Sequence, residues 1–246
     1  MPMDLLVVGA GEMGRWFAEE MAPVFDRVDF FDIDSDVAIE AAATVDTGWV
    51  DHDDRAYDVV CIAVPMSVAT ESIREQAPRA KRAMVDITGS MGDPIDAMRT
   101  YLPNQERLSL HPLFSATNAP GSIAVVSDKS GPISEIILER LSHLGNTLVP
   151  TTADEHDKAM ETVQAKVHTS ILAFALAADA VPEGLETPIY RELDELARSV
   201  TVGTPQVYAE IQDRFNGATS VANAAKALAD ADRETFVRLY KDAGDR

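Results

Sequence analysis

Three side chains, far apart in the sequence, have the types needed for acid–base chemistry and for binding an anion. His111 stands before Pro112, which keeps its backbone out of the helical region and fixes its ring at the mouth of a loop. Such an imidazole suits a general base or a polariser of a hydroxyl, and equally a structural hydrogen-bonding histidine. His168, on a predicted helix, is either half-buried and satisfied or directed into a cleft. Arg198 can pair with Asp194 one turn earlier or clamp a carboxylate.

Other polar residues are candidates of a weaker kind. Thr88 and Ser90 follow a predicted strand and could face a ligand, although Thr88 and Gly89 could equally just make a turn. His156 stands between two acids in the first turn of a predicted helix, and we interpret it as a local hydrogen-bonding or capping residue. The histidines show no metal-ligand spacing, and the single cysteine, Cys61, lies in an apolar run typical of a buried strand. We therefore expect no metal centre.

A glycine-rich turn between a strand and a helix predicts a dinucleotide site. The apolar segment 4–8 runs directly into the sequence Gly-Ala-Gly-Glu-Met-Gly. Its glycines permit a tight turn, a close approach of the backbone to a pyrophosphate, and close packing of the helix on the sheet. The start of that helix offers N–H groups to phosphates. The predicted cofactor-binding residues of this turn are Gly9, Gly11, Glu12, Met13 and Gly14.

An acid at the end of the next strand indicates which dinucleotide binds. The predicted strand 28–31 is followed directly by Asp32, where a carboxylate can hydrogen-bond the adenosine ribose. The segment 32–36 contains no Arg or Lys that could neutralise a 2′-phosphate, so NAD is favoured over NADP. Val64 and Pro65 follow the third predicted strand at the edge where such sheets bind cofactors, and they complete the predicted cofactor site.

The order of elements predicts an α/β protein, with an N-terminal Rossmann-type doubly wound parallel sheet followed by an all-helical C-terminal domain. After Pro150 the pattern changes, because Thr152 and Glu155 form a capping box and only helical segments follow. We therefore expect an NAD-binding domain over 1–150 and a helical substrate and dimerisation domain over 151–246, the latter role by analogy of fold. The predicted strands are 5–8, 28–31, 59–64, 83–87, 107–110, 123–127 and 147–149; the predicted helices before Pro150 are 12–21, 36–43, 68–75, 95–101 and 132–144.

Composition limits the partners. The formal net charge of −20 over 246 residues disfavours nucleic acid and anionic membranes. Acidic residues are spread along the whole chain, which is typical of a protein from a high-salt cytoplasm, although a generic acidic cytosolic enzyme would also fit. The single cysteine fits a cytoplasmic location, and no apolar run is long enough to span a bilayer.

Taken together, these segments resemble the prephenate/arogenate dehydrogenase family of tyrosine biosynthesis, in its short archaeal-type form. The His-Pro-Leu-Phe sequence, together with Glu-His-Asp and the later Tyr-Ala-Glu-Ile-Gln stretch, is the most specific part. The segments that carry the resemblance are 11–17, 63–65, 86–88, 111–114, 155–157 and 205–212.

This resemblance implies NAD-dependent oxidative decarboxylation of prephenate to 4-hydroxyphenylpyruvate by a homodimer. It assigns His111 to the ring hydroxyl, His168 to a second active-site position and Arg198 to a substrate carboxylate. The family commonly has Ser and then Lys where this chain has Gly89-Ser90-Met91, which leaves the role of Ser90 open. Three alternatives stay open: an arogenate dehydrogenase, a β-hydroxyacid or imine reductase using Lys166, and a non-catalytic NAD-binding sensor.

Overall fold

The computed structural model describes residues 3–51 and 55–245, which form two compact units, Met1–Asp157 and Lys158–Arg246. The division falls at Asp157 rather than at Pro150. The difference has a physical cause. In the first half of helix α6 (Ala153–Met160), His156 contacts His111 and Asp157 accepts from Met91 N, so these residues belong to the first unit.

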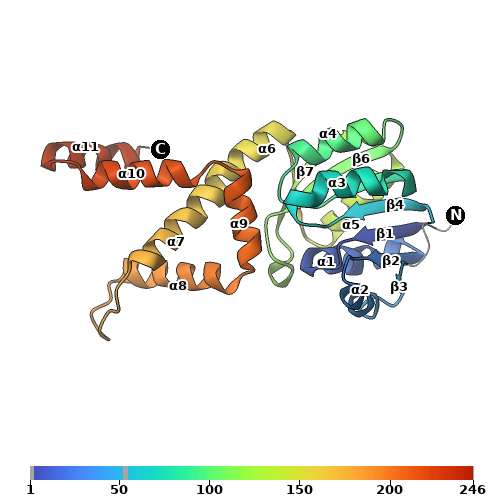
Figure 1. The fold of residues 1–246 in the computed structure, drawn as a ribbon, viewed down its shortest axis with the longest axis horizontal. Coiled ribbons are helices and arrows are strands. Elements are labelled where there is room, and N and C mark those ends of the chain that lie inside the picture. Colours follow the sequence, from blue (N-terminus) through green and yellow to red (C-terminus); the bar gives the residue numbers. More distant parts are fainter. Residues whose placement is uncertain (1–2, 52–54, 246) are drawn as a thin grey trace. The chain divides into compact units, whose positions relative to one another are not determined.

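The first unit is built around one sheet, whose strands within the described residues have the order β3-β2-β1-β4-β5-β6-β7-β8 (Figure 1). The arrangement confirms the predicted Rossmann-type α/β class. Every pairing is parallel except that of β6 with β7, so the prediction of a fully parallel sheet is wrong at this one place. The strands are β1 (Asp4–Val8), β2 (Arg27–Phe31), β3 (Gly48–Val50), β4 (Tyr57–Ile62), β5 (Ala80–Asp86), β6 (Glu106–Pro112), β7 (Ser122–Lys129) and β8 (Thr147–Pro150).

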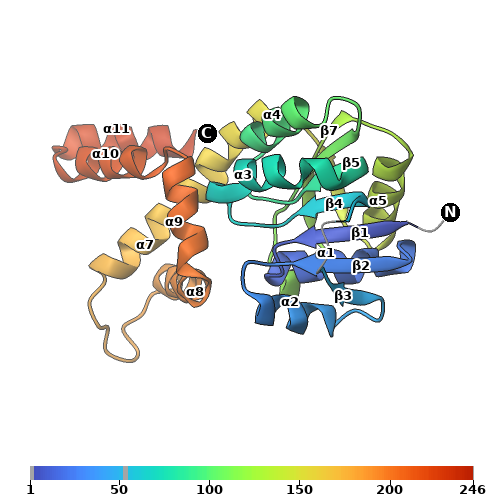
Figure 2. The same cartoon turned by 45° about the vertical axis from the view of Figure 1, so that its right-hand side comes forward.

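Helices cover both faces of this sheet (Figures 1 and 2). One apolar core lies under α1 (Glu12–Met21), α2 (Ser35–Ala42) and α5 (Pro132–His143), and includes the fully buried Phe17 and Phe30. A second core lies under α3 (Met66–Gln76) and α4 (Gly92–Tyr101), and includes Ile73 and Met98. Each such buried side chain contributes roughly 1.5–3 kcal/mol to stability. The central strands are therefore held from both sides, and their carboxyl ends form a rigid edge.

The second unit is helical, as predicted. The Thr152–Glu155 capping box that precedes it is present, since Thr152 Oγ1 accepts from Glu155 N at 3.2 Å and Glu155 Oε2 accepts from Thr152 N at 3.3 Å. Helices α10 and α11 lie side by side in both views of the ribbon (Figures 1 and 2). The helices are α7 (Val167–Ala177), α8 (Pro188–Val202), α9 (Pro205–Arg214), α10 (Ala218–Ala229) and α11 (Arg233–Gly244).

A π-helical segment, η4 (Glu161–Lys166), joins α6 to α7. Such segments insert an extra residue and leave backbone groups to be satisfied from outside the helix. Here the Ala165 carbonyl accepts from Gln212 Nε2 at 3.0 Å and lies 2.8 Å from Thr169 Oγ1. Gly217 packs against the same residue so closely that a Cβ there would overlap Ala165. The segment 205–212, singled out in the sequence, thus supports the π-helix.

Among the described residues, no helix is long and apolar enough to cross a bilayer.

Candidate active site

The glycine turn has the geometry that a dinucleotide requires. Gly9 adopts φ +95° and donates from its N–H to Phe31 O at 2.8 Å. A Cβ at Gly9 would overlap the Ala63 carbonyl, and one at Gly14 would overlap the Gly9 carbonyl. A Cβ at Gly11 would meet no described atom within 4 Å. Two glycines are thus required by packing, whereas Gly11 faces open space at the start of α1, where a pyrophosphate would lie.

Asp32 lies directly beside this turn. Its Oδ2 accepts from Ala10 N at 2.8 Å and its Oδ1 accepts from Asp34 N at 3.0 Å, so the carboxylate is fixed at the carboxyl end of β2. The side chain is only partly buried and can reach a ribose. This turn and its acid fit a bound NAD, because N–H groups, space without a side chain and a ribose acceptor occur together.

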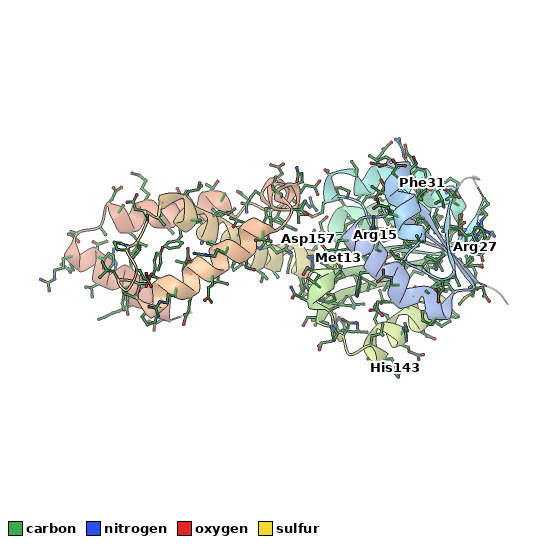
Figure 3. The ribbon with its side chains drawn as sticks, turned by 90° about the horizontal axis from the view of Figure 1, so that it is seen from below. Met13, Arg15, Arg27, Phe31, His143 and Asp157 are labelled. Carbon is green, nitrogen blue, oxygen red and sulfur yellow. The ribbon has the colours of Figure 1, made fainter. Side chains whose placement is uncertain are left out.

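The remaining predicted cofactor residues surround the same turn. Val64 packs 3.1 Å from the position of a Cβ on Gly9, and Pro65 precedes the first turn of α3. Met13 packs against the first core from α1, the helix on which Figure 3 labels it. Glu12 Oε1 accepts from Ala116 N at 2.8 Å, so its side chain holds the loop that follows His111.

A group of polar side chains is buried at the carboxyl ends of β5 and β6. Asp86 Oδ2 accepts from Ser109 Oγ at 2.7 Å, and Oδ1 accepts from Thr88 N at 3.1 Å. Thr88 Oγ1 donates to Ser90 O at 3.2 Å, so its side chain is bonded within the bend that follows β5. We call this group the edge cluster; its buried members are Asp86, Thr88, Ser90, Ser109, His111 and His156.

His111 belongs to a row of three polar side chains inside the first unit. Its Nδ1 lies 2.8 Å from Nε2 of His156, and the two rings are inclined at 74°. Nδ1 of His156 in turn lies 2.9 Å from Oδ1 of Asp157. Asp157 also accepts from Met91 N at 3.0 Å and from Gly92 N at 3.1 Å, where α4 begins. Figure 3 labels Asp157 on the ribbon.

Burial and neighbours set the charges of this row. Burial and, to a smaller extent, the adjacent His156 lower the pKa of His111 to about 3, against the opposing effect of Asp157. Burial acts to raise the pKa of Asp157, but hydrogen bonds from His156 and from Met91 N and Gly92 N hold this pKa below its ordinary value. Near neutral pH the row therefore joins a neutral His111 to an ionised Asp157.

Asp86 differs from Asp157 although both are acids of this region. Burial, with a smaller contribution from the negative charge of Asp157, raises the pKa of Asp86 to about 7 against the hydrogen bonds from Ser109 and Thr88. Cys61 is buried close by, and burial raises the pKa of its thiol well above the ordinary value. The thiol is thus un-ionised and suits a packing role, as expected from its apolar surroundings.

His168 and Arg198 both lie in the second unit. His168 is half-buried, with its ring 4.8 Å from that of Tyr208, and within the part of the chain that the structure describes its Nδ1 has no hydrogen-bond partner. Burial lowers the pKa of His168. Arg198 pairs with Asp194 through Nε at 2.9 Å and Nη2 at 2.8 Å, while its side chain remains 78% exposed. It borders a hollow of about 310 Å³ that Tyr190 and Thr201 also line.

Sequence reasoning missed the part that His156 and Asp157 play. His156 does make a local hydrogen bond, to Asp157, but its other ring nitrogen contacts His111, 45 positions away. A signal was present in the Glu-His-Asp segment, which is part of the family resemblance and places an imidazole beside a carboxylate. Nothing in the sequence itself indicated that this pair meets His111.

Known proteins share this sequence pattern and fold. No family model matches the chain. Over 97% of its length the chain is 22% identical to the probable arogenate/prephenate dehydrogenase of Methanocaldococcus jannaschii, and over 84% it is 27% identical to the T-protein of Enterobacter agglomerans. These matches cover 59% and 55% of those proteins, so the chain spans little more than half the length of the curated relatives.

The fold has a solved counterpart. The prephenate dehydrogenase from A. aeolicus, in complex with hydroxyphenyl propionate and NAD+, matches with a TM-score of 0.73 over 99% of this chain and 93% of that chain, at 13% identity. The chain resembles prephenate and arogenate dehydrogenases. This resemblance, first inferred from short sequence segments, is confirmed over nearly the whole chain, and the solved structure adds likeness of fold.

Proposed function

We propose that this chain is an NAD-dependent dehydrogenase that oxidatively decarboxylates prephenate to 4-hydroxyphenylpyruvate, with arogenate as the alternative substrate. The observation that carries the proposal is a buried, neutral His111 at the carboxyl edge of a sheet whose glycine turn and Asp32 fit NAD. The names of the relatives support the substrate class.

In this proposal, the glycine turn and Asp32 hold the dinucleotide. Gly11 and the first N–H groups of α1 would hold the pyrophosphate, and Asp32 would accept from the ribose hydroxyls. When bound, NAD supplies the acceptor for a hydride. Asp32 is an anion, and it would repel a 2′-phosphate, which favours NAD over NADP.

His111 would act on the hydroxyl of the substrate ring. The reaction removes a hydride from C4 and releases the ring carboxylate as carbon dioxide, and the hydroxyl proton remains on the phenol product. As the hydride leaves, positive charge develops on the C4 hydroxyl, and a neutral imidazole that accepts its hydrogen bond stabilises that charge. A protonated imidazole could not, so the lowered pKa of His111 suits the task.

Residues of the second unit would bind the rest of the substrate. Arg198 offers a planar, permanently charged guanidinium to a carboxylate. Such a local positive charge would allow a chain of net charge −20 to bind prephenate, which carries two carboxylates. His168 offers its Nδ1, and Thr88 and Ser90 of the edge cluster remain candidates for contacts to substrate.

We further propose that the chain forms a homodimer through its second unit. Large apolar side chains are exposed there on several helices: Leu176 is 89% exposed, Ile189 77%, Val202 85% and Tyr240 73%. So many exposed apolar residues on one unit favour an interface over contact with water. Light scattering after size exclusion tests this, and a monomer at micromolar concentration would contradict it.

The test of function is NADH formation in high KCl with four combinations of substrate and cofactor, prephenate or arogenate with NAD or NADP. We expect reduction of NAD that depends on prephenate. Reduction with arogenate alone would reassign the substrate. No reaction in any combination, from folded protein that binds NADH, would contradict the proposed reaction.

A further inference from the structure

We propose that Asp157 and His156 are positioning residues that hold His111 in one tautomer, with the proton on Nδ1 and the lone pair on Nε2. Only the kinetic consequence rests on the proposed function. The tautomer itself is a property of the free protein and can be measured without any substrate.

The argument starts at Asp157. Met91 N and Gly92 N donate to its carboxylate, and the lowered pKa keeps it ionised, so it can only accept. The hydrogen in the 2.9 Å contact therefore belongs to Nδ1 of His156. In the proposed arrangement His156 carries a single N–H, on Nδ1, which leaves its Nε2 with a lone pair.

The same reasoning passes to the next ring. Nε2 of His156 lies 2.8 Å from Nδ1 of His111, and one hydrogen must lie between the two nitrogens. Because His156 has none to give there, His111 donates from Nδ1. His111 is neutral, so its Nε2 carries the lone pair and is the nitrogen that can accept from a substrate hydroxyl.

The backbone of α4 fixes the start of this chain of hydrogen bonds. Met91 N and Gly92 N donate to different oxygens of Asp157, so the carboxylate can neither rotate nor withdraw without losing them. The start of a helix also favours an anion through its partial positive charge. The start of α4 thus determines, through Asp157 and His156, which nitrogen of His111 can accept a hydrogen bond.

This arrangement would also act during the reaction. Positive charge that develops at the substrate hydroxyl is passed in part to His111, and the ionised Asp157 stabilises it through His156. The logic is that of a carboxylate that orients a catalytic histidine in hydrolases, where a wrong tautomer is costly. Here the oriented group is a second histidine placed between acid and catalyst.

The direct test is nitrogen-15 NMR of the imidazoles in the free wild-type protein at pH 7. We expect Nδ1 of His111 and Nδ1 of His156 to be protonated, and Nε2 of both rings to carry lone pairs. A proton found on Nε2 of His111 would overturn the proposal, whatever the activity of the protein.

His156→Phe separates positioning from packing, because it keeps a ring and removes the acceptor. We expect the proton of His111 to move to Nε2, and kcat for prephenate to fall about 10²–10³-fold with KM changed less than threefold. The matched control is His143→Phe on the exposed end of α5, which should change neither the tautomer nor kcat. An unchanged tautomer in His156→Phe would contradict the inference.

Asp157→Asn is the second variant, in case His156→Phe does not fold. It removes the charge but keeps an oxygen that can cap α4, and Asp154→Asn on the same helix is its control. We expect kcat to fall at least tenfold, whereas wild-type kcat would contradict the role. The expected tautomer without turnover of any substrate would refute the function alone, and the reverse tautomer with normal turnover would refute this inference alone.

Discussion

Ser109 donates a 2.7 Å hydrogen bond to Asp86, and both side chains are buried where β5 and β6 run side by side. The same carboxyl accepts from Thr88 N, so Asp86 fixes the turn that follows β5. A carboxyl group this deeply buried resists ionisation, and its pKa rises to about 7 because burial outweighs the two hydrogen bonds.

Asp86 therefore makes stability depend on pH. Its pKa is higher in the folded chain than in the unfolded chain, so the folded state binds the extra proton and stability falls as pH rises from about 4 to about 7. Asp86→Asn cannot titrate, and the advantage of wild type over this variant should shrink by about 2–4 kcal/mol across that range. Urea unfolding at constant KCl measures it, with Asp154→Asn as control. Parallel curves for Asp86→Asn and wild type would show that Asp86 is ionised throughout.

Substitution of two glycines should separate binding from folding. Gly11→Ala adds a methyl group into open space, so the melting temperature should stay within about 2 °C while affinity for NADH falls at least tenfold. Gly14→Ala forces a methyl group onto the Gly9 carbonyl and should lower the melting temperature markedly. Thermal unfolding and NADH fluorescence titration distinguish the two. Undiminished NADH affinity in Gly11→Ala would place the pyrophosphate elsewhere.

Loss of the imidazole at position 111 should affect turnover far more than binding. In His111→Asn, we expect kcat to fall about 10²–10⁴-fold while KM changes little, because an amide oxygen can accept the hydrogen bond but is a far weaker base than the imidazole nitrogen. Steady-state kinetics with prephenate measures both constants. Near-normal turnover would refute the role of His111.

Arg198 should act on binding. Arg198→Ala should raise KM for prephenate about tenfold or more with kcat largely kept, because a charged carboxylate contact is lost. Asp194→Ala releases the guanidinium from its present partner and should leave KM equal or lower. Arg191→Ala, an exposed arginine of the same helix, is the control. Equal KM values in Arg198→Ala and wild type would remove Arg198 from the substrate site.

The net charge should make the fold depend on salt. Self-repulsion at −20 is screened as ionic strength rises, so the melting temperature should increase by about 5 °C or more between 0.1 M and 2 M KCl. Differential scanning calorimetry measures this, with an uncharged osmolyte at matched osmolality as control. A flat response would favour an ordinary acidic enzyme over a halophilic one.

Most of the fold could be predicted from the sequence because long apolar runs alternate with helical periodicity through the first unit. The prediction missed β3, since Gly48–Val50 is too short to show a pattern. The antiparallel pairing of β6 with β7 was foreseeable in part, because the segment 113–121 between them contains no crossover helix. Parallel order was assumed there from the neighbouring strands.

The site could be predicted only residue by residue. His111 was identified because a proline follows it at the end of a strand, a local signal. Its contact with His156 joins residues 45 positions apart, and only packing determines such a contact. Asp86 illustrates the same limit, since its raised pKa depends on complete burial beside Ser109, which the sequence of β5 does not reveal.

Asp157 serves two purposes at once, because one carboxylate caps α4 and holds His156. Natural selection for the capping of α4 can continue after selection for the contact with His156 has stopped. A descendant that abandoned the reaction could lose both histidines at little cost to folding, yet it would keep an acid at this position for the sake of the helix. An acid retained without its histidines would therefore mark the homologues that have kept this architecture and given up its chemistry.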